Sequence, residues 1–176
     1  PAGQYYQAIA GTSMSSPHIA GSAILEKSLH PSWTPGQIKS ALMTTAKTSV
    51  VKEDGVTPAD PFDDGSGRVD LTKAHDPGLT FDETAADMAL LGGDKVHAID
   101  LNLPSINAPV MPGSVTTVRT AVNVTNRTQS YKVTTTAPAD SSITVSPRSS
   151  TRASLSVIIS KRFKGRSEER RVGKEC

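Results

Sequence analysis

The chain has 176 residues, of which 19 are Lys or Arg and 17 are Asp or Glu, giving a formal net charge of +2. This length suits one complete domain or two partial ones, and so small a charge gives no reason to expect nucleic acid as a partner. No apolar run approaches the roughly 18 residues that a membrane-spanning helix needs, so we expect no membrane association.

A short strand, a turn and a helix are predicted at the start of the chain. Residues 6–10 are compatible with a strand that enters a turn at Gly11 and Thr12. A helix is predicted from Ser13 to about Leu29, with Pro17 in about its first turn, where a missing N–H costs least. The side chains spaced for one side of this helix are Ile19, Ala20, Ala23, Ile24 and Lys27.

A second helix is predicted after a break at residues 30–33. Thr34 has the features of an N-cap, with Pro35 at the first helical position and Gln37 three residues after the cap. The apolar stripe of this helix consists of Ile38, Ala41, Leu42 and Ala46.

Residues 48–78 are rich in Asp, Gly and Pro and are expected to form a loop with one short strand at 68–71. A short helix is expected from Glu83 to Leu91, capped by Asp82 and stopped by the glycines at 92 and 93.

Beyond about Val96 the apolar residues recur at every second position, which is typical of strands. The runs are residues 118–124, 131–135, 143–145 and 155–159, with turn-forming residues between them. Such short strands predict a β-sandwich of immunoglobulin or fibronectin type III style. About seventy residues are present where such a domain needs nearer a hundred, so we expect it to be incomplete.

The chemically informative segment is residues 11–21, GTSMSSPHIAG. It places Ser13 at the start of a helix, directly after a glycine turn. A helix start presents unpaired N–H groups and positive potential, so Ser13 could attack a carbonyl while its own N–H stabilises the oxyanion. From spacing alone, an ordinary serine N-cap is the commoner alternative.

This segment closely resembles the nucleophile motif of the subtilisin-like serine proteases. HPSWTPGQIKSALMTTA (30–46) resembles the helix pair after the family's serine, and DPFDDGSGRVDLTKAHDPGLTFD (60–82) resembles the segment that closes its catalytic domain. DLNLPSINAPV (100–110) and TAVNVTNRTQSYKV (120–133) resemble the fibronectin type III-like domain of larger members. The resemblance covers residues 1 to about 160.

The resemblance implies an α/β fold in three parts. Residues 1–95 would be the C-terminal part of a subtilisin-like catalytic domain, containing the helix pair after the nucleophile. Residues 96–160 would be a truncated fibronectin type III-like β-sandwich, and residues 161–176 a non-native tail.

The resemblance also implies that Ser13 is the nucleophile of a serine endopeptidase. It would attack a peptide carbonyl, a histidine would take its proton, an aspartate would orient the histidine, and water would hydrolyse the acyl-enzyme. In the family both partners precede the serine, so they and the oxyanion-hole asparagine are expected upstream of Pro1. The chain alone is therefore expected to be inactive.

The implied parent protein is secreted, its signal peptide lies upstream, and its substrates are proteins or peptides. No cofactor or metal is implied, and the oligomeric state is left open. A catalytically dead subtilase serving as a binding or adhesion module remains the alternative. An α/β-hydrolase is disfavoured, because its G-x-S-x-G elbow needs glycine where this chain has Ser15.

His18 lies five residues after Ser13 on the same helix, so it is expected to point well off the direction of the serine. The resemblance implies that this histidine is structural and not the general base. His30, His75 and His97 are expected at a helix end and in loops. Met14 is expected to pack, although the family position is sensitive to oxidation.

Asp60, Asp63, Asp64 and Asp70 lack EF-hand spacing and are expected to be a solvated loop. Residues 123–125 and 126–128 match the N-glycosylation pattern. Residues 166–176, RSEERRVGKEC, resemble the translation of a sequencing-library adapter. We exclude them from the fold, and with them the only cysteine, Cys176.

Overall fold

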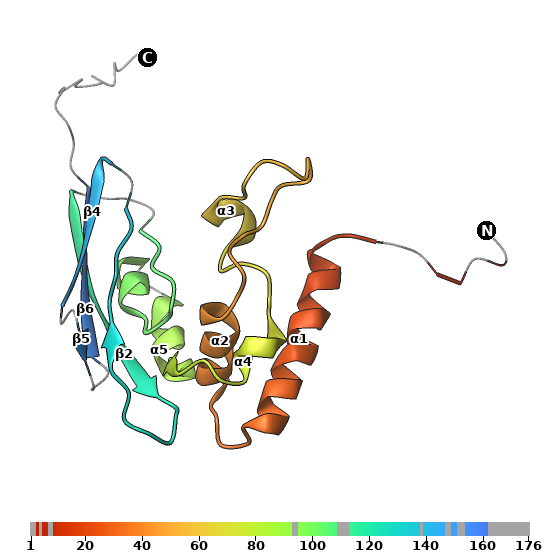
Figure 1. Ribbon diagram of the computed structural model, residues 1–176, viewed down its shortest axis with the longest axis horizontal. Coiled ribbons are helices and arrows are strands. Elements are labelled where there is room, and N and C mark those ends of the chain that lie inside the picture. The colour runs from red at the N-terminus through yellow and green to blue at the C-terminus, as the bar shows by residue number, and fades with distance from the viewer. Residues whose placement is uncertain are drawn as a thin grey trace, which may run out of the picture.

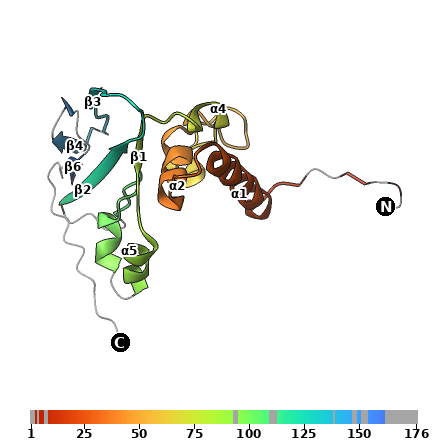
Figure 2. The ribbon, with the colours of Figure 1, turned by 90° about the horizontal axis from the view of Figure 1, so that it is seen from below.

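The structure is a computed structural model of the chain. It describes residues 3, 5, 6, 9–92, 95–108, 113–137, 139–146, 149–150 and 154–161. Of the expected tail, all but Lys161 lies outside the described residues. In both views the sheet lies on one side of the molecule and α1 on the other, with α2 between them (Figures 1 and 2).

The two predicted N-terminal helices are confirmed. α1 spans Thr12–Leu29 and α2 spans Pro35–Thr44. α2 begins with the predicted capping box: the Gln37 N–H donates to the Thr34 hydroxyl over 3.1 Å, and the Thr34 N–H donates to Gln37 Oε1 over 3.1 Å. This local pairing satisfies two of the donors that a helix start leaves free.

Two expectations at the start of the chain are wrong. Tyr6, Ile9 and Ala10 are not in a strand, and Tyr6 is 97% exposed, so these residues have no sheet to join; Gln7 and Ala8 lie outside the described residues. Pro17 is the sixth residue of α1 rather than part of its first turn. It therefore has no N–H to donate to the Ser13 carbonyl.

The core lies between α2 and the segment around Ala74. Its buried members are Trp33, Ile38, Ala41, Leu42 and Ala74, which confirms the main positions of the predicted α2 stripe.

The buried side of α1 differs from the predicted one. Ser22 and Glu26 are buried, and of the predicted set only Ala23 is packed against the core. Ile19 and Ile24 are 45% and 69% exposed. The reason is that α1 meets the rest of the described chain mainly through α2, which covers a narrow strip of its surface.

The segment after α2 contains isolated bridges and short helices. Lys47 pairs with Arg68, and Val51 with Pro58. The strand predicted at 68–71 is wrong, because after this one bridge the chain turns into a helix. The helices are α3 (Pro61–Asp64) and α4 (Leu71–Ala74).

Asp70 is the N-cap of α4 and is buried. Its Oδ1 accepts from the hydroxyl of Thr72 over 2.6 Å, and its Oδ2 lies 3.3 Å from Lys47 Nζ. The Thr72 hydroxyl above all, with Lys47 contributing, holds the pKa of Asp70 below its usual value.

This lowered pKa predicts a loss of stability in acid. A group whose pKa is depressed on folding stabilises the fold above its unfolded pKa, about 3.9 for Asp, and that stability is lost as pH falls through the folded pKa. We expect Asp70→Asn to lower the Tm at pH 7, with the difference from wild type shrinking below about pH 4. Thermal denaturation from pH 3 to pH 7 measures this; a difference that does not vary with pH would contradict it.

The helix predicted at 83–91 is present as α5 (Ala85–Ala89) followed by the 3₁₀ turn η1 (Leu90–Gly92). Its cap is Thr84 and not Asp82, because the Thr84 hydroxyl accepts the Asp87 N–H over 3.1 Å. Asp82 instead accepts from the Thr34 hydroxyl over 2.5 Å. A second 3₁₀ segment, η2, spans Lys95–Asp100.

The predicted strands of the second half form two antiparallel sheets. One sheet has four strands in the order β1-β2-β6-β4, and β3 pairs with β5 in the other. Their bounds are β1 Leu79–Phe81, β2 Ser114–Asn123, β3 Tyr131–Lys132, β4 Ser141–Ser146, β5 Ser149–Ser150 and β6 Ser154–Lys161.

β1 joins the two halves of the chain. It pairs with β2 through Leu79↔Asn123 and Phe81↔Ala121. On its other side the Phe81 N–H donates to Ser40 Oγ on α2 over 2.8 Å. The sheet is therefore continuous with the segment that packs on α2.

Gly36 allows α2 to approach this segment. A Cβ at Gly36 would lie 2.7 Å from Glu83 N and 2.8 Å from Glu83 O. Gly36→Ala is therefore expected to destabilise the protein by about 1–3 kcal/mol, measured by thermal denaturation. Gly92 is the matched control: its Cβ would meet nothing within 4 Å, so Gly92→Ala should stay within about 0.5 kcal/mol. Equal stabilities of the two variants would contradict this packing.

Candidate active site: the start of α1

Ser13 is the second residue of α1 and is exposed. Gly11 precedes the helix as its N-cap with φ 154° and ψ 165°, a conformation that favours glycine. The Gly11 carbonyl accepts the N–H of Met14 over 3.0 Å and that of Ser15 over 3.1 Å. The glycine turn thus closes the first helical turn around Ser13.

The backbone N–H of Ser13 belongs to the first turn, where no helical carbonyl is available to accept it. The described first turn carries no acidic side chain, and Lys27 lies in the last turn, where it suits the helix dipole. The positive end of α1 is therefore not neutralised locally. An oxyanion formed beside Ser13 would be stabilised there.

His18 makes its hydrogen bond to the backbone of α1 and not to the serine. Its Nδ1 lies 2.6 Å from the carbonyl oxygen of Met14, one turn earlier, and the only polar group there is an acceptor, so Nδ1 donates. This contact fixes the ring along α1 and supports the structural role expected for His18.

The other histidines lie away from α1's first turn. His30 stacks on Trp33 with ring centroids 3.7 Å apart, and His30 Nε2 lies 2.9 Å from the His75 carbonyl oxygen. His97 lies in η2 rather than in a loop. Met14 is 37% exposed, so it is not a core residue of this chain.

Within the described part of the chain, no hydrogen bond to the Ser13 hydroxyl is formed, and no histidine and aspartate are brought beside it. The structure thus places Ser13, the candidate nucleophile, and its N–H at an exposed helix start, whereas the general base expected upstream is not among these residues.

The aspartates of the 60–70 segment have local partners. Asp60 Oδ1 accepts the Phe62 N–H over 2.8 Å, and Asp63 pairs with Lys52 over 2.9 Å. The described residues contain no group of three or more His, Cys, Asp or Glu that could hold a metal ion.

None of the helices described is long and apolar enough to cross a membrane.

Comparison with known proteins agrees with this layout. The profile of the subtilase family matches residues 1–81, and that of a fibronectin type-III domain matches residues 100–165. Subtilisin-like protease SBT3.11 of Arabidopsis thaliana is 37% identical over 167 residues, and subtilisin-like protease SBT3.1 of the same plant is 40% identical over 168. Each match covers 78% of this chain and 22% of the relative.

The chain therefore spans about a fifth of the length of the curated relatives it matches. The chain belongs to the subtilase family through residues 1–81, with a fibronectin type-III domain following at residues 100–165.

Proposed function

We propose that the intact protein containing this chain is a secreted serine endopeptidase that hydrolyses peptide bonds through an acyl-enzyme on Ser13. The observation that carries the proposal is the exposed Ser13 at the start of α1, behind the Gly11 turn and within the family's nucleophile motif. Secretion is the expectation that accompanies the family resemblance.

The proposed reaction begins when the Ser13 hydroxyl attacks the scissile carbonyl. A histidine supplied by the remainder of the catalytic domain takes the proton and returns it to the leaving amine, and water then hydrolyses the ester. The Ser13 N–H and the positive end of α1 contribute to stabilising the negative charge on the carbonyl oxygen.

His18 is not the base in this proposal. Its Nδ1 already donates to the Met14 carbonyl and not to the Ser13 hydroxyl. The catalytic histidine and aspartate precede the serine in this family, so the activity belongs to the intact protein, and this chain alone is expected to be inactive.

The alternative is a subtilase that has lost its catalytic partners and serves as a binding or adhesion module. Sequencing the gene upstream of Pro1 and assaying the encoded protein on casein separates the two. Catalytic Asp and His motifs together with casein hydrolysis support the endopeptidase. Substituted motifs together with an absence of casein hydrolysis would contradict the endopeptidase and support the binding module.

A further inference from the structure

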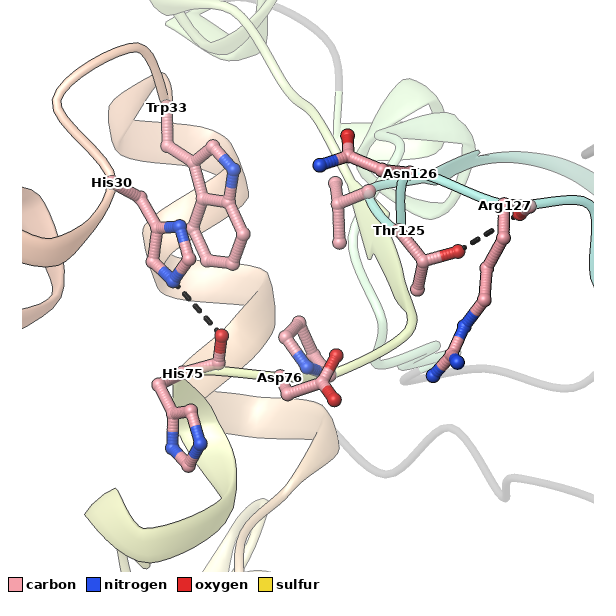
Figure 3. Close-up of a pocket in the computed structure, with 9 residues that line it drawn as sticks. His30, Trp33, His75, Asp76, Thr125, Asn126 and Arg127 are labelled. Carbon is pink, nitrogen blue, oxygen red and sulfur yellow. Dashed lines mark hydrogen bonds between the residues drawn. The ribbon is translucent and has the colours of Figure 1, made fainter.

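A pocket of about 400 Å³ lies where the connection between α1 and α2 meets the turn after β2 (Figure 3). Its volume falls within the range of about 300–1,000 Å³ that is typical of small-ligand sites, which are frequent where two domains meet. One wall comes from the subtilase part of the chain and the other from the fibronectin domain.

The first wall is aromatic and held in place. His30 and Trp33 are stacked with an interplanar angle of 7°, and the His30 ring is tied to the His75 carbonyl. Trp33 itself is buried, 8% exposed. The surface that this wall offers to an apolar group is therefore that of the half-buried His30 ring, which is held in place by its stacking on Trp33.

The second wall is a turn shaped by Asn123. Its Oδ1 accepts from the N–H and the hydroxyl of Thr125 over 2.9 and 2.7 Å, and its Nδ2 donates to the Arg127 carbonyl over 3.0 Å. These bonds fix the backbone that carries Asn126 and Arg127. Figure 3 shows the Asn126 side chain directed toward Trp33 across the pocket.

Two opposite charges line this pocket, Asp76 from the subtilase part and Arg127 from the fibronectin domain. Neither takes part in the two ion pairs found among the described residues. Both side chains are exposed. A purely anionic ligand would face Asp76, and a purely cationic one would face Arg127. The lining therefore suits a dipolar ligand that carries an ammonium group and a carboxylate.

We propose that this pocket binds short peptides with free termini. Asp76 receives the α-ammonium group, Arg127 and the Asn126 amide bind the α-carboxylate, and a side chain lies against the His30–Trp33 wall. Such peptides are the products of the proposed proteolysis, and in this respect the inference rests on that function.

The pocket lies at the opposite end of α1 from Ser13. α1 has 18 residues and is therefore about 27 Å long. A bound product would consequently connect the two domains without reaching the serine, and Asp76 and Arg127 can be changed without altering the residues around Ser13.

The test uses the intact protein with Ser13→Ala, so that no peptide is consumed. Isothermal titration with glycyl-phenylalanine is expected to show saturable binding. Because a hydrogen bond to a charged group contributes about 1.5–3 kcal/mol, Asp76→Asn and Arg127→Gln should each weaken binding at least about tenfold. The N-acetylated and C-amidated dipeptides should lose binding to a similar degree, and Lys132→Gln, an exposed change on β3, should leave it unchanged.

The proposal would be overturned if no saturable binding were seen. It would also be overturned if the capped peptides bound as tightly as the free dipeptide, or if either pocket variant bound it as tightly as the unaltered pocket. The measurement does not depend on catalysis. An active protease that fails to bind the dipeptide refutes the pocket alone, and an inactive protein that binds it refutes only the endopeptidase.

Discussion

Replacing Ser13 by alanine in the intact protein is expected to lower kcat for peptide hydrolysis on the order of 10⁶-fold, the size of the loss when subtilisin itself loses its serine. Alanine has no hydroxyl to form the acyl-enzyme, so both chemical steps of the proposed mechanism are lost. The helix start and its N–H groups remain, so KM should change little. The measurement is steady-state hydrolysis of a chromogenic peptide.

Ser15→Ala is the matched control for this variant. Ser15 lies in the same turn of α1, and its hydroxyl donates to the Gly11 carbonyl over 3.3 Å. Losing this exposed hydrogen bond should change kcat by less than about tenfold, since such a bond contributes about 1 kcal/mol. A Ser13→Ala protein that remains active, or equal losses in the two variants, would remove Ser13 from the mechanism.

Replacing Arg119 by methionine is expected to destabilise the fibronectin domain by about 3–5 kcal/mol, through the loss of buried, charge-assisted hydrogen bonds. Arg119 lies on β2 and is only 4% exposed. Its Nε donates to Leu103 O over 2.8 Å, and its Nη2 to Ile99 O over 2.8 Å. Its Nη1 donates to the Thr117 hydroxyl over 2.7 Å.

This network holds residues 99–105 against β2. Methionine would leave the Leu103 and Ser105 carbonyls without their arginine donor, whereas the Ile99 carbonyl would keep its hydrogen bond from the Thr117 hydroxyl. Burial lowers the pKa of Arg119, while Asp100 and Glu83 favour its charged form. Arg119→Lys should recover only part of the loss, because a lysine ammonium has three donors and cannot span the same acceptors.

Urea denaturation followed by circular dichroism measures these changes. Arg127→Met, at an exposed position in the turn after β2, is the control and should stay within about 0.5 kcal/mol. If Arg119→Met were no less stable than Arg127→Met, the hydrogen bonds of Arg119 would not be a main attachment of the 99–105 segment.

The sequence predicts those parts of the fold that depend on near neighbours. The capping box of α2 links Thr34 to Gln37, three residues apart, and both residue types are diagnostic by themselves. The helix start at Ser13 is equally local, because a glycine turn and a serine suffice to indicate it. The helix start could therefore be located without coordinates, whereas the role of Ser13 as candidate nucleophile comes from the family resemblance, since spacing alone favours an ordinary N-cap.

What the sequence does not predict is decided by distant partners. β1 is recognisable only because residues 79–81 pair with residues 121–123, about forty positions later. The 68–71 segment has apolar character, yet a single bridge with Lys47 leaves it no partner strand, and Asp70 starts a helix instead.

β2 gives the clearest case. The alternation at residues 118–124 is confirmed, but the buried side is the one that carries Thr117, Arg119 and Ala121, whereas Val118 is 54% exposed. The alternation of apolar residues does not reveal that five oxygen atoms are placed to accept hydrogen bonds from Arg119 on the buried side of β2. Only the position of residues 99–105 makes the burial of a charge favourable.

The candidate active site also depends on residues that are distant in the sequence. Ser13 and its N–H come from one helix turn, whereas a catalytic base must be delivered by another part of the protein. The most direct measurement is reaction of the intact protein with a fluorophosphonate, followed by mass spectrometry of the labelled peptide. One covalent adduct is expected, on Ser13, and Ser13→Ala should abolish it. An adduct on a different serine, or no adduct in a protein that carries the upstream Asp and His motifs, would contradict it.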